Sequence, residues 1–137
     1  MKVWSPARDP GIRLLRIGVA VLLAIHGLSR IRSGGVVGFG AYLGGEGVPA
    51  GPLVAWILTL VEILGTPLLA AGIGVIPLAA WFAVELGAGI AMVHGREGWF
   101  VVGGGRNGSE YSVCLIIALA AIVASEIYWS GRGPARD

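Results

Sequence analysis

Four long apolar stretches constrain the fold of this chain more than any other feature. They cover residues 12–31, 53–73, 76–93 and 111–129. Each is close to the roughly 20 residues with which an α-helix crosses the hydrocarbon core of a bilayer, and none alternates apolar with polar residues as a barrel strand does. The sequence therefore predicts an all-α, integral membrane four-helix bundle, with the 137 residues forming a single membrane domain.

The amino-acid composition also fits a lipid environment. Hydrophobic residues make up 55% of the chain and charged residues 13%, whereas soluble globular domains have roughly 45–50% and about 25%. So few polar side chains cannot cover a water-soluble surface, and the lipid bilayer is the first expected partner. The net charge is +2, but the basic residues flank the apolar stretches and do not form a stripe. We therefore expect no nucleic-acid partner.

The connections between the apolar stretches differ in length. The second and third stretches are separated only by Gly74 and Val75, and Pro77 follows closely, which predicts a tight antiparallel helical hairpin. The other two connections, residues 33–52 and 95–109, are long, rich in glycine and on one side of the membrane. We expect glycine-rich loops that cap this end of the bundle, with aromatic residues such as Trp99 and Phe100 in the lid.

The distribution of lysine and arginine predicts the orientation in the membrane. Six of these residues lie on the side of the termini and four on the loop side: Lys2, Arg8, Arg13, Arg16, Arg132 and Arg136 against Arg30, Arg32, Arg96 and Arg106. Because cytoplasmic segments are enriched in basic residues, we expect a multi-pass protein of the cell (inner) membrane with cytoplasmic termini. A small-residue cleavage site does not follow residues 12–31, so we interpret them as a retained span and not as a signal peptide.

Two acidic residues stand inside the apolar stretches, where a charge is costly. Glu62 lies in the second stretch and Glu85 in the third, at similar numbers of residues from the turn near Gly74. At 1.5 Å of rise per residue, the two carboxyl groups lie within roughly 2 Å of the same depth. Side chains at one depth on neighbouring helices can share a proton. The alternative is that they face different directions and that each is protonated or hydrogen-bonded separately.

A second group of polar residues gathers at the loop end of the predicted bundle. His26 and Arg30 are four residues apart and share one face of the first helix, while His94 ends the third stretch and Glu110 begins the fourth. The candidate ligand-binding residues are His26, Arg30, Glu62, His94, Asn107, Glu110 and Tyr111. Hydrogen-bonding groups beside apolar walls suit a quinone or another flat, polar-headed ligand. The alternative is a structural network in which Glu110 neutralises Arg30.

The remaining polar residues predict less chemistry. Arg16 lies near the membrane surface on the terminal side with Glu126 as its candidate partner, so we expect a polar network of Arg16, Glu85 and Glu126. The single cysteine, Cys114, cannot form an internal disulfide. The histidines and acids match no standard metal-binding spacing, and the chain has no recognisable motif for haem, flavin or an iron–sulfur cluster. A quinone is thus the candidate cofactor, no metal is expected, and catalytic residues are not assigned.

Several short motifs resemble the DoxX family of small four-helix membrane proteins. The chain has Leu14-Leu15-Arg16, then His26-Gly27 followed by Arg30, and further on Gly45, Glu46, Gly47, Val48, Pro49, Glu62, Gly65, His94, Phe100, Asn107, Gly108, Glu110 and Tyr111. Their order and spacing carry the resemblance over roughly residues 12–125. The candidate ligand-binding residues and Arg16 fall on motif positions, whereas Glu85 does not belong to the family pattern.

The resemblance implies a bacterial or archaeal membrane protein related to subunits of quinone-linked oxidases and thiosulfate:quinone oxidoreductases. On that basis we expect a membrane subunit that assists a redox system and obtains electrons through a protein partner. We expect it to contact a quinone at the end of the bundle where His26 and Glu110 lie. Two other classes stay open, namely a purely structural subunit of a larger membrane complex and a small proton-coupled transporter. Catalytic turnover and assembly as a homo-oligomer also stay open.

Overall fold

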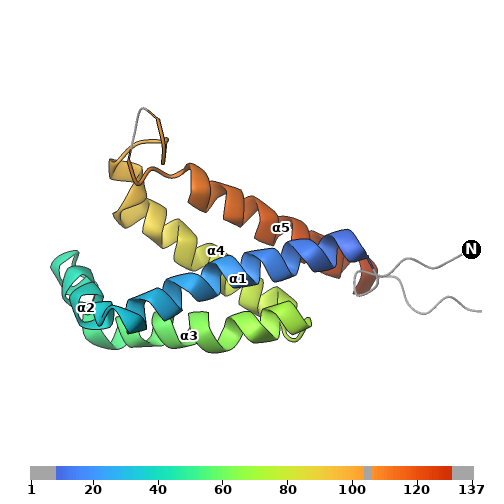
Figure 1. Cartoon of the computed structure of the whole chain (residues 1–137), viewed down its shortest axis with the longest axis horizontal. Coiled ribbons are helices and arrows are strands. Elements are labelled where there is room, and N and C mark those ends of the chain that lie inside the picture. Colours follow the sequence, from blue (N-terminus) through green and yellow to red (C-terminus); the bar gives the residue numbers. More distant parts are fainter. Residues whose placement is uncertain (1–8, 104–105, 131–137) are drawn as a thin grey trace, which may run out of the picture.

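The computed structural model describes residues 9–103 and 106–130, and these ranges contain helices and connections but no β-strand. In chain order the elements are α1 (Pro10–Arg32), α2 (Gly35–Gly45), α3 (Gly51–Ala71), α4 (Val75–Met92), the 3-10 helix η1 (His94–Arg96) and α5 (Glu110–Ser130) (Figure 1). The all-α fold predicted from the sequence is confirmed. Lys2, Arg8, Arg132 and Arg136, on which the predicted orientation partly rests, lie outside the described residues.

Four of these helices, α1, α3, α4 and α5, are long and apolar enough to cross a membrane. They overlap the four apolar stretches of the sequence and begin and end within a few residues of them. Their outer faces expose large apolar side chains, such as Leu14 at 72%, Val84 at 73% and Ile117 at 64% exposed. So much exposed apolar surface would be unfavourable in water, and it is the surface that lipid covers in a membrane bundle.

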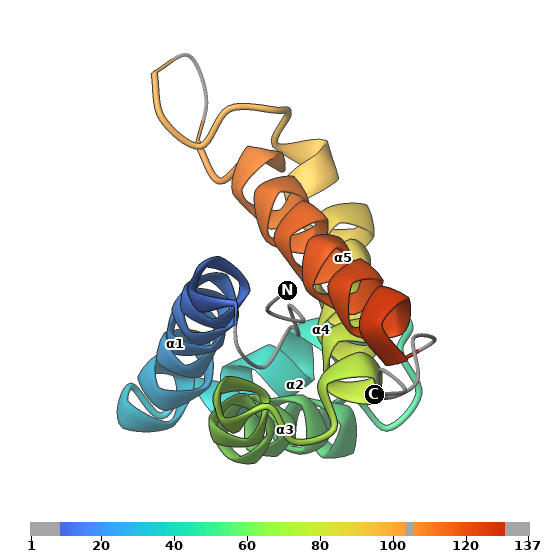
Figure 2. The same cartoon turned by 90° about the vertical axis from the view of Figure 1, so that its right-hand side faces the viewer.

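The four long helices form two pairs, with α1 packed on α3 and α4 packed on α5 (Figure 2). We use the name turn end for the region that contains the start of α1, the turn 72–74 and the end of α5. The loop end is the opposite region, which contains α2 and residues 93–109. The pairs meet near the turn end and diverge toward the loop end (Figure 1). The predicted tight turn between α3 and α4 is present, with Gly72 and Gly74 at φ 83° and 61°, but these two helices separate as they leave it.

The main hydrophobic core lies where the two pairs meet. Its buried residues are Val19, Ala20, Leu23, Leu69, Val75, Ala79, Phe82, Leu115, Leu119 and Ile122. They come from all four long helices, so this core joins the pairs. Asp9 fixes the start of α1 beside the core, because its carboxylate accepts hydrogen bonds from the backbone N–H groups of Gly11 and Ile12, at 2.6 and 3.0 Å.

The sequence predicted a loop for the glycine-rich connection 33–52. This prediction is wrong, because the connection contains the helix α2. Val36 and Leu43 of α2 are buried against Ala55 of α3. Gly40 lets the helices approach closely, since a Cβ atom at this position would lie 2.7 Å from the Cα of Pro52. Packing of an apolar face outweighs the low helix propensity of glycine here, which composition alone did not reveal.

Candidate functional site

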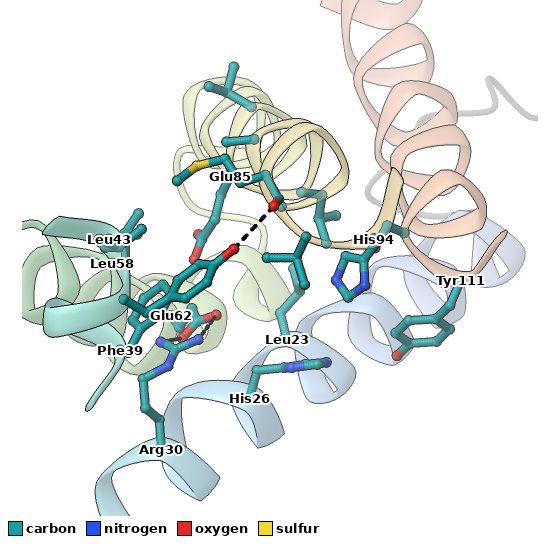
Figure 3. A pocket seen from close by; sticks show the side chains of 18 of the residues that line it. Leu23, His26, Arg30, Phe39, Leu43, Leu58, Glu62, Glu85, His94 and Tyr111 are labelled. Atoms are coloured by element: carbon teal, nitrogen blue, oxygen red, sulfur yellow. Dashed lines mark hydrogen bonds and ion pairs between the residues drawn. The ribbon is translucent and has the colours of Figure 1, made fainter. Parts of the chain in front are cut away.

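A cavity of about 500 Å³ lies between the two helix pairs at the loop end (Figure 3). Residues of every α-helix line it, together with η1 and the connection that follows. Its walls are mainly apolar, with Leu23, Leu58 and Leu86 among them. The predicted ligand-binding residues at this cavity are His26, Arg30, Glu62, His94, Asn107 and Tyr111. The volume falls within the range of pockets that bind small molecules, roughly 300–1,000 Å³.

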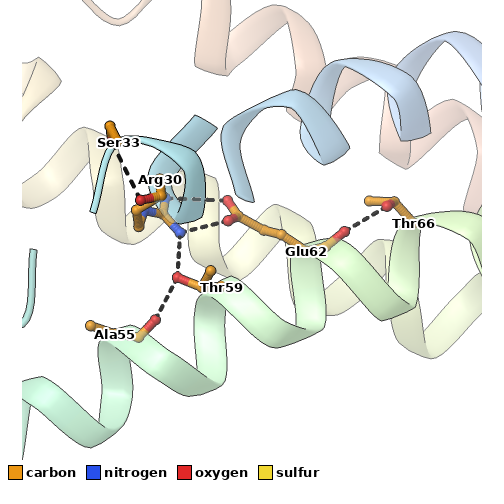
Figure 4. Close-up of polar contacts among 6 residues, drawn as sticks. All are labelled: Arg30, Ser33, Ala55, Thr59, Glu62 and Thr66. Carbon is orange, nitrogen blue, oxygen red and sulfur yellow. Dashed lines mark hydrogen bonds and ion pairs between the residues drawn. The ribbon is translucent and has the colours of Figure 1, made fainter. Parts of the chain in front are cut away.

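An ion pair between Arg30 of α1 and Glu62 of α3 forms the deep wall of the cavity (Figure 4). Nη1 of Arg30 lies 2.6 Å from Oε2 of Glu62 and also donates to Oγ1 of Thr59 at 2.9 Å. The guanidinium lies over the ring of Phe39, 4.5 Å from its centroid. These contacts compensate a glutamate that is only 4% exposed in an apolar region. The alternative in which Glu110 neutralises Arg30 is wrong.

Gly27 allows this ion pair to form. A Cβ atom at Gly27 would lie only 2.9 Å from the Cβ of Glu62, so α1 and α3 are in close contact one turn before Arg30. The missing side chain brings the guanidinium within reach of the carboxylate. Thr59 lies three residues before Glu62 on the same face of α3, and this spacing in the sequence could have predicted its role.

Glu85 of α4 adds a second carboxyl group to the deep wall, and it points into the cavity (Figure 3). It interacts electrostatically with Glu62 and with Arg30, so the two acids do not face in different directions. Within residues 9–103 and 106–130, Oε2 of Glu85 is buried and has no hydrogen-bond partner. Two carboxyl groups therefore share one arginine, and the arginine is already bound to Glu62.

The shallow part of the cavity, nearer to residues 93–109, is lined by imidazole and phenol groups. Nδ1 of His94 lies 2.8 Å from the backbone oxygen of Asn107. Because a carbonyl oxygen only accepts hydrogen bonds, Nδ1 carries the hydrogen, and Nε2 of a neutral His94 is left as an acceptor. The rings of His26 and Tyr111 lie 6.4 Å apart, tilted by 32°. Both of these side chains are exposed.

Most of the residues that line this cavity lie in the part of the chain that a family model matches. The family model described as DoxX matches residues 11–95, more than half of the chain. The chain belongs to the DoxX family. No curated protein and no solved structure matches the chain. The DoxX match contains His26, Arg30, Glu62 and His94, and it ends before the connection to α5.

Glu110, in the part of this DoxX protein beyond the match, does not line the cavity. Its Oε1 accepts a hydrogen bond from the backbone N–H of Val101 at 2.9 Å, and its own N–H donates to the oxygen of Trp99 at 3.0 Å. Glu110 thus fixes the connection between η1 and α5 to the first turn of α5. The contact that Glu110 makes with Val101 is structural. A contact between Glu110 and a ligand stays a prediction.

The aromatic lid predicted over the loop end is only partly correct. Trp99 and Phe100 are about half exposed and do not line the cavity. The aromatic residues that do line it from the lid are Phe39 and Tyr42 of α2. Neither residue stands out in the sequence, because a glycine-rich segment predicts a loop, and the helical face that carries both side chains exists only once α2 forms.

Two contacts hold α2 of the DoxX protein to the opposite helix pair. The hydroxyl of Tyr42 donates to the backbone oxygen of Met92 at 3.1 Å. Arg96 binds both carboxylate oxygens of Glu46, with distances of 3.1 and 2.7 Å. This hydrogen-bonded carboxylate raises the pKa of the Arg96 guanidinium above its ordinary value. We call these two contacts the α2 latch, because they join the diverging pairs across the cavity.

The Arg16 and Glu126 pair that the sequence suggested is present at the turn end. Nη1 of Arg16 lies 3.6 Å from Oε1 of Glu126, and Arg16 is only 6% exposed. Neither residue lines the cavity. Of the expected polar network, Glu85 therefore lies in a different place from Arg16 and Glu126. No group of three or more His, Cys, Asp or Glu side chains in the described part of the chain could hold a metal ion.

Proposed function

We propose that this DoxX-family protein is a membrane subunit of a quinone-linked redox system and that its cavity holds the quinone head group. One observation carries the proposal: a cavity of about 500 Å³ with apolar walls and a few polar side chains is built into a membrane-spanning bundle. A flat ring with polar oxygens and an apolar tail requires this combination of surfaces. The family likeness to quinone-linked subunits supports the same ligand class.

Two exposed residues of the cavity wall belong to a helix that is long and apolar enough to cross the membrane, which favours a lipid-soluble ligand. Trp81 and Val84 of α4 line the cavity and are 41% and 73% exposed. A ligand dissolved in the hydrocarbon phase can enter past these residues, and its tail can remain in lipid. This entrance lies one turn from Glu85, so the ring belongs in the deep part of the cavity and not at Glu110.

Electron transfer requires a partner under this proposal. The sequence has no recognisable motif for haem, flavin or an iron–sulfur cluster. A partner protein in the same membrane would therefore supply or remove the electrons, and the present chain would bind and orient the quinone. We place the complex in the inner membrane with the chain termini in the cytoplasm, as the basic residues predict.

Quinone binding can be measured on the purified protein in lipid nanodiscs with decylubiquinone as the probe. We expect saturable binding that Ala88→Phe weakens by roughly tenfold or more, equivalent to about 1.4 kcal/mol, because Ala88 lines the cavity. The matched control is Ala120→Phe, since Ala120 is also an exposed alanine but lies in a separate groove between α4 and α5. Equal binding by both variants and the unmodified protein would exclude this site.

A small proton-coupled transporter is the second candidate, and the pair of carboxyl groups favours it. Glu62 and Glu85 face one cavity and interact with each other, as a site that alternates between a proton and a cationic substrate would require. In vesicles with an imposed pH gradient, this candidate predicts uptake of ethidium that Glu85→Gln abolishes. Absence of uptake by the unmodified protein would remove it and leave the quinone proposal unaffected.

A further inference from the structure

Glu85 has hydrogen-bonding capacity that the protein itself does not use. In the described part of the chain, the buried side-chain atoms without a hydrogen-bond partner are Nε of Arg16 and Oε2 of Glu85. Only Oε2 of Glu85 belongs to a residue that lines the cavity. Leaving such a polar atom unsatisfied in an apolar region costs about 1–3 kcal/mol. A ligand in the cavity can supply the missing partner.

Glu85 interacts with one cation, Arg30, with a second acid, Glu62, and with the side chain of Trp81 one turn earlier on α4. The titratable and charged groups that face this region are Arg30 and His26 on α1, Tyr42 on α2, Glu62 on α3, His94 on η1 and Tyr111 on α5. Arg30 already binds Glu62, and the hydroxyl of Tyr42 donates to Met92. An unpaired carboxylate in a low-dielectric site is unfavourable. Oε2 of Glu85 still has no partner, and either a proton or a hydrogen-bond donor on the ligand would satisfy it.

His94 lies nearer to the loop end than Glu85 does. A Cβ atom at Gly89, one helical turn after Glu85, would lie 3.8 Å from the ring of His94. The entrance at Trp81 and Val84 adjoins Glu85, so a ring whose tail stays in lipid has its oxygen beside this carboxyl group.

We propose that Glu85 is the proton-exchanging contact of the quinone head group and selects between its two redox forms. As a carboxylic acid, Glu85 donates a hydrogen bond to a carbonyl oxygen of the oxidised ring. As a carboxylate, it accepts a hydrogen bond from a hydroxyl group of the reduced ring. The inference concerns binding only and rests on the proposed quinone site. Binding of the oxidised form to the carboxylate state takes up one proton, whereas binding of the reduced form to the acid state releases one.

This linkage gives the two redox forms opposite pH dependences. The oxidised form binds the protonated state, so its affinity rises as the pH falls. The reduced form binds the deprotonated state, so its affinity rises as the pH rises. One linked proton changes each affinity by at most about tenfold per pH unit. Titration of a group that does not contact the ring would not produce slopes of opposite sign for the two forms.

The test measures the dissociation constants of decylubiquinone and, without oxygen, of its reduced form between about pH 6 and pH 9, the range in which buried glutamates titrate. The unmodified protein should show slopes of opposite sign. Glu85→Gln should flatten both slopes, because an amide can donate and accept hydrogen bonds but does not titrate. Glu126→Gln is the matched control that should keep both slopes, since Glu126 lies outside the cavity.

Calorimetry of the unmodified protein in two buffers of different ionisation enthalpy counts the exchanged protons directly, and it does not depend on the folding of a variant. Uptake with the oxidised form and release with the reduced form support the proposal. Slopes of equal sign, flat slopes in the unmodified protein, or opposite slopes that persist in Glu85→Gln would each overturn the role of Glu85 while the quinone site stands. Absence of quinone binding at every pH would instead overturn the proposed function.

Discussion

The turn end and the loop end of the bundle each contain an ion pair of arginine and glutamate in which one partner is buried, but only the loop end contains the cavity described above. At the turn end, Arg16 lies 3.6 Å from Glu126, and the core that joins the two helix pairs adjoins it. At the loop end, Arg30 lies 2.6 Å from Glu62, the pairs diverge, and Glu85 adds a second acid. A buried ion pair is therefore weak evidence for a site, whereas a surplus carboxyl group at a cavity is stronger evidence.

The largest expected difference between the two ends concerns their arginines. Arg30→Met leaves Glu62 and Glu85 without a cation in an apolar region, and breaking a buried ion pair costs about 3–5 kcal/mol. Arg16→Met should cost less, because the side chain of Glu126 is 23% exposed and can reach water or lipid head groups. Thermal unfolding midpoints in detergent would check both variants.

A double variant separates the ion pair from the packing around it. Arg30→Met with Glu62→Met removes both charges, and similar variants in other proteins retain most of their stability. We expect it to recover most of the loss caused by Arg30→Met alone. If Arg30→Met is as stable as the unmodified protein, the pair does not compensate a buried charge, and the contrast between the two ends fails.

Two glycines of α1 provide the next largest difference. At Gly27 a new Cβ atom would meet the Cβ of Glu62 at 2.9 Å, whereas at Gly18 it would meet nothing within 4 Å. Gly27→Ala should therefore separate α1 from α3 and lower stability by about 1–3 kcal/mol. Gly18→Ala should leave stability unchanged or slightly raised, and equal effects of the two variants in thermal unfolding would contradict the close helix contact.

The latch at α2 should have a smaller effect on stability than either helix contact. Tyr42→Phe removes one hydrogen bond to Met92, which is worth about 0.5–1.5 kcal/mol. Hydrogen exchange of the α2 backbone should accelerate while α1 and α3 remain protected. Unchanged exchange in α2 would show that packing on α3 alone holds this helix.

The smallest effect is expected from the exposed part of the latch. Arg96→Gln removes a surface ion pair with Glu46, and such pairs contribute little and weaken as salt increases. Because the pKa of Arg96 is raised on folding, the pair favours the folded state while Arg96 is protonated and Glu46 is a carboxylate. On the alkaline side its contribution is lost only as the pH rises into the strongly alkaline range. A salt-sensitive change in α2 exchange at neutral pH is the expected result, and a salt-independent change would contradict it.

The sequence predicted the membrane bundle well because helix length and apolar composition act locally. The similar depth of Glu62 and Glu85 was also predictable, because a fixed rise per residue and a short turn determine it. The pairing of Arg30 with Glu62 was not predicted, because it depends on the close contact at Gly27. The helix α2 was missed for a related reason: its glycines suggested a loop, while its stability comes from packing against α3.

The sequence also did not predict that the two helix pairs diverge. The short turn at residues 72–74 predicted a tight hairpin of α3 and α4, but each of these helices packs mainly on another partner. Choice of partner depends on side-chain complementarity over many residues and not on the length of a turn. The cavity results from this choice, so the sequence indicated its polar residues without indicating its volume.

The central claim is that a quinone binds between the diverging pairs at the loop end. Photolabelling with a photoreactive short-chain quinone, followed by mass spectrometry of the labelled peptides, tests it most directly. The account predicts labels on cavity residues such as Leu58, Leu86 and Met92, and loss of these labels when excess decylubiquinone is added. Labels confined to the outer groove around Ala120 and Val123, or labels that excess decylubiquinone does not reduce, would contradict it.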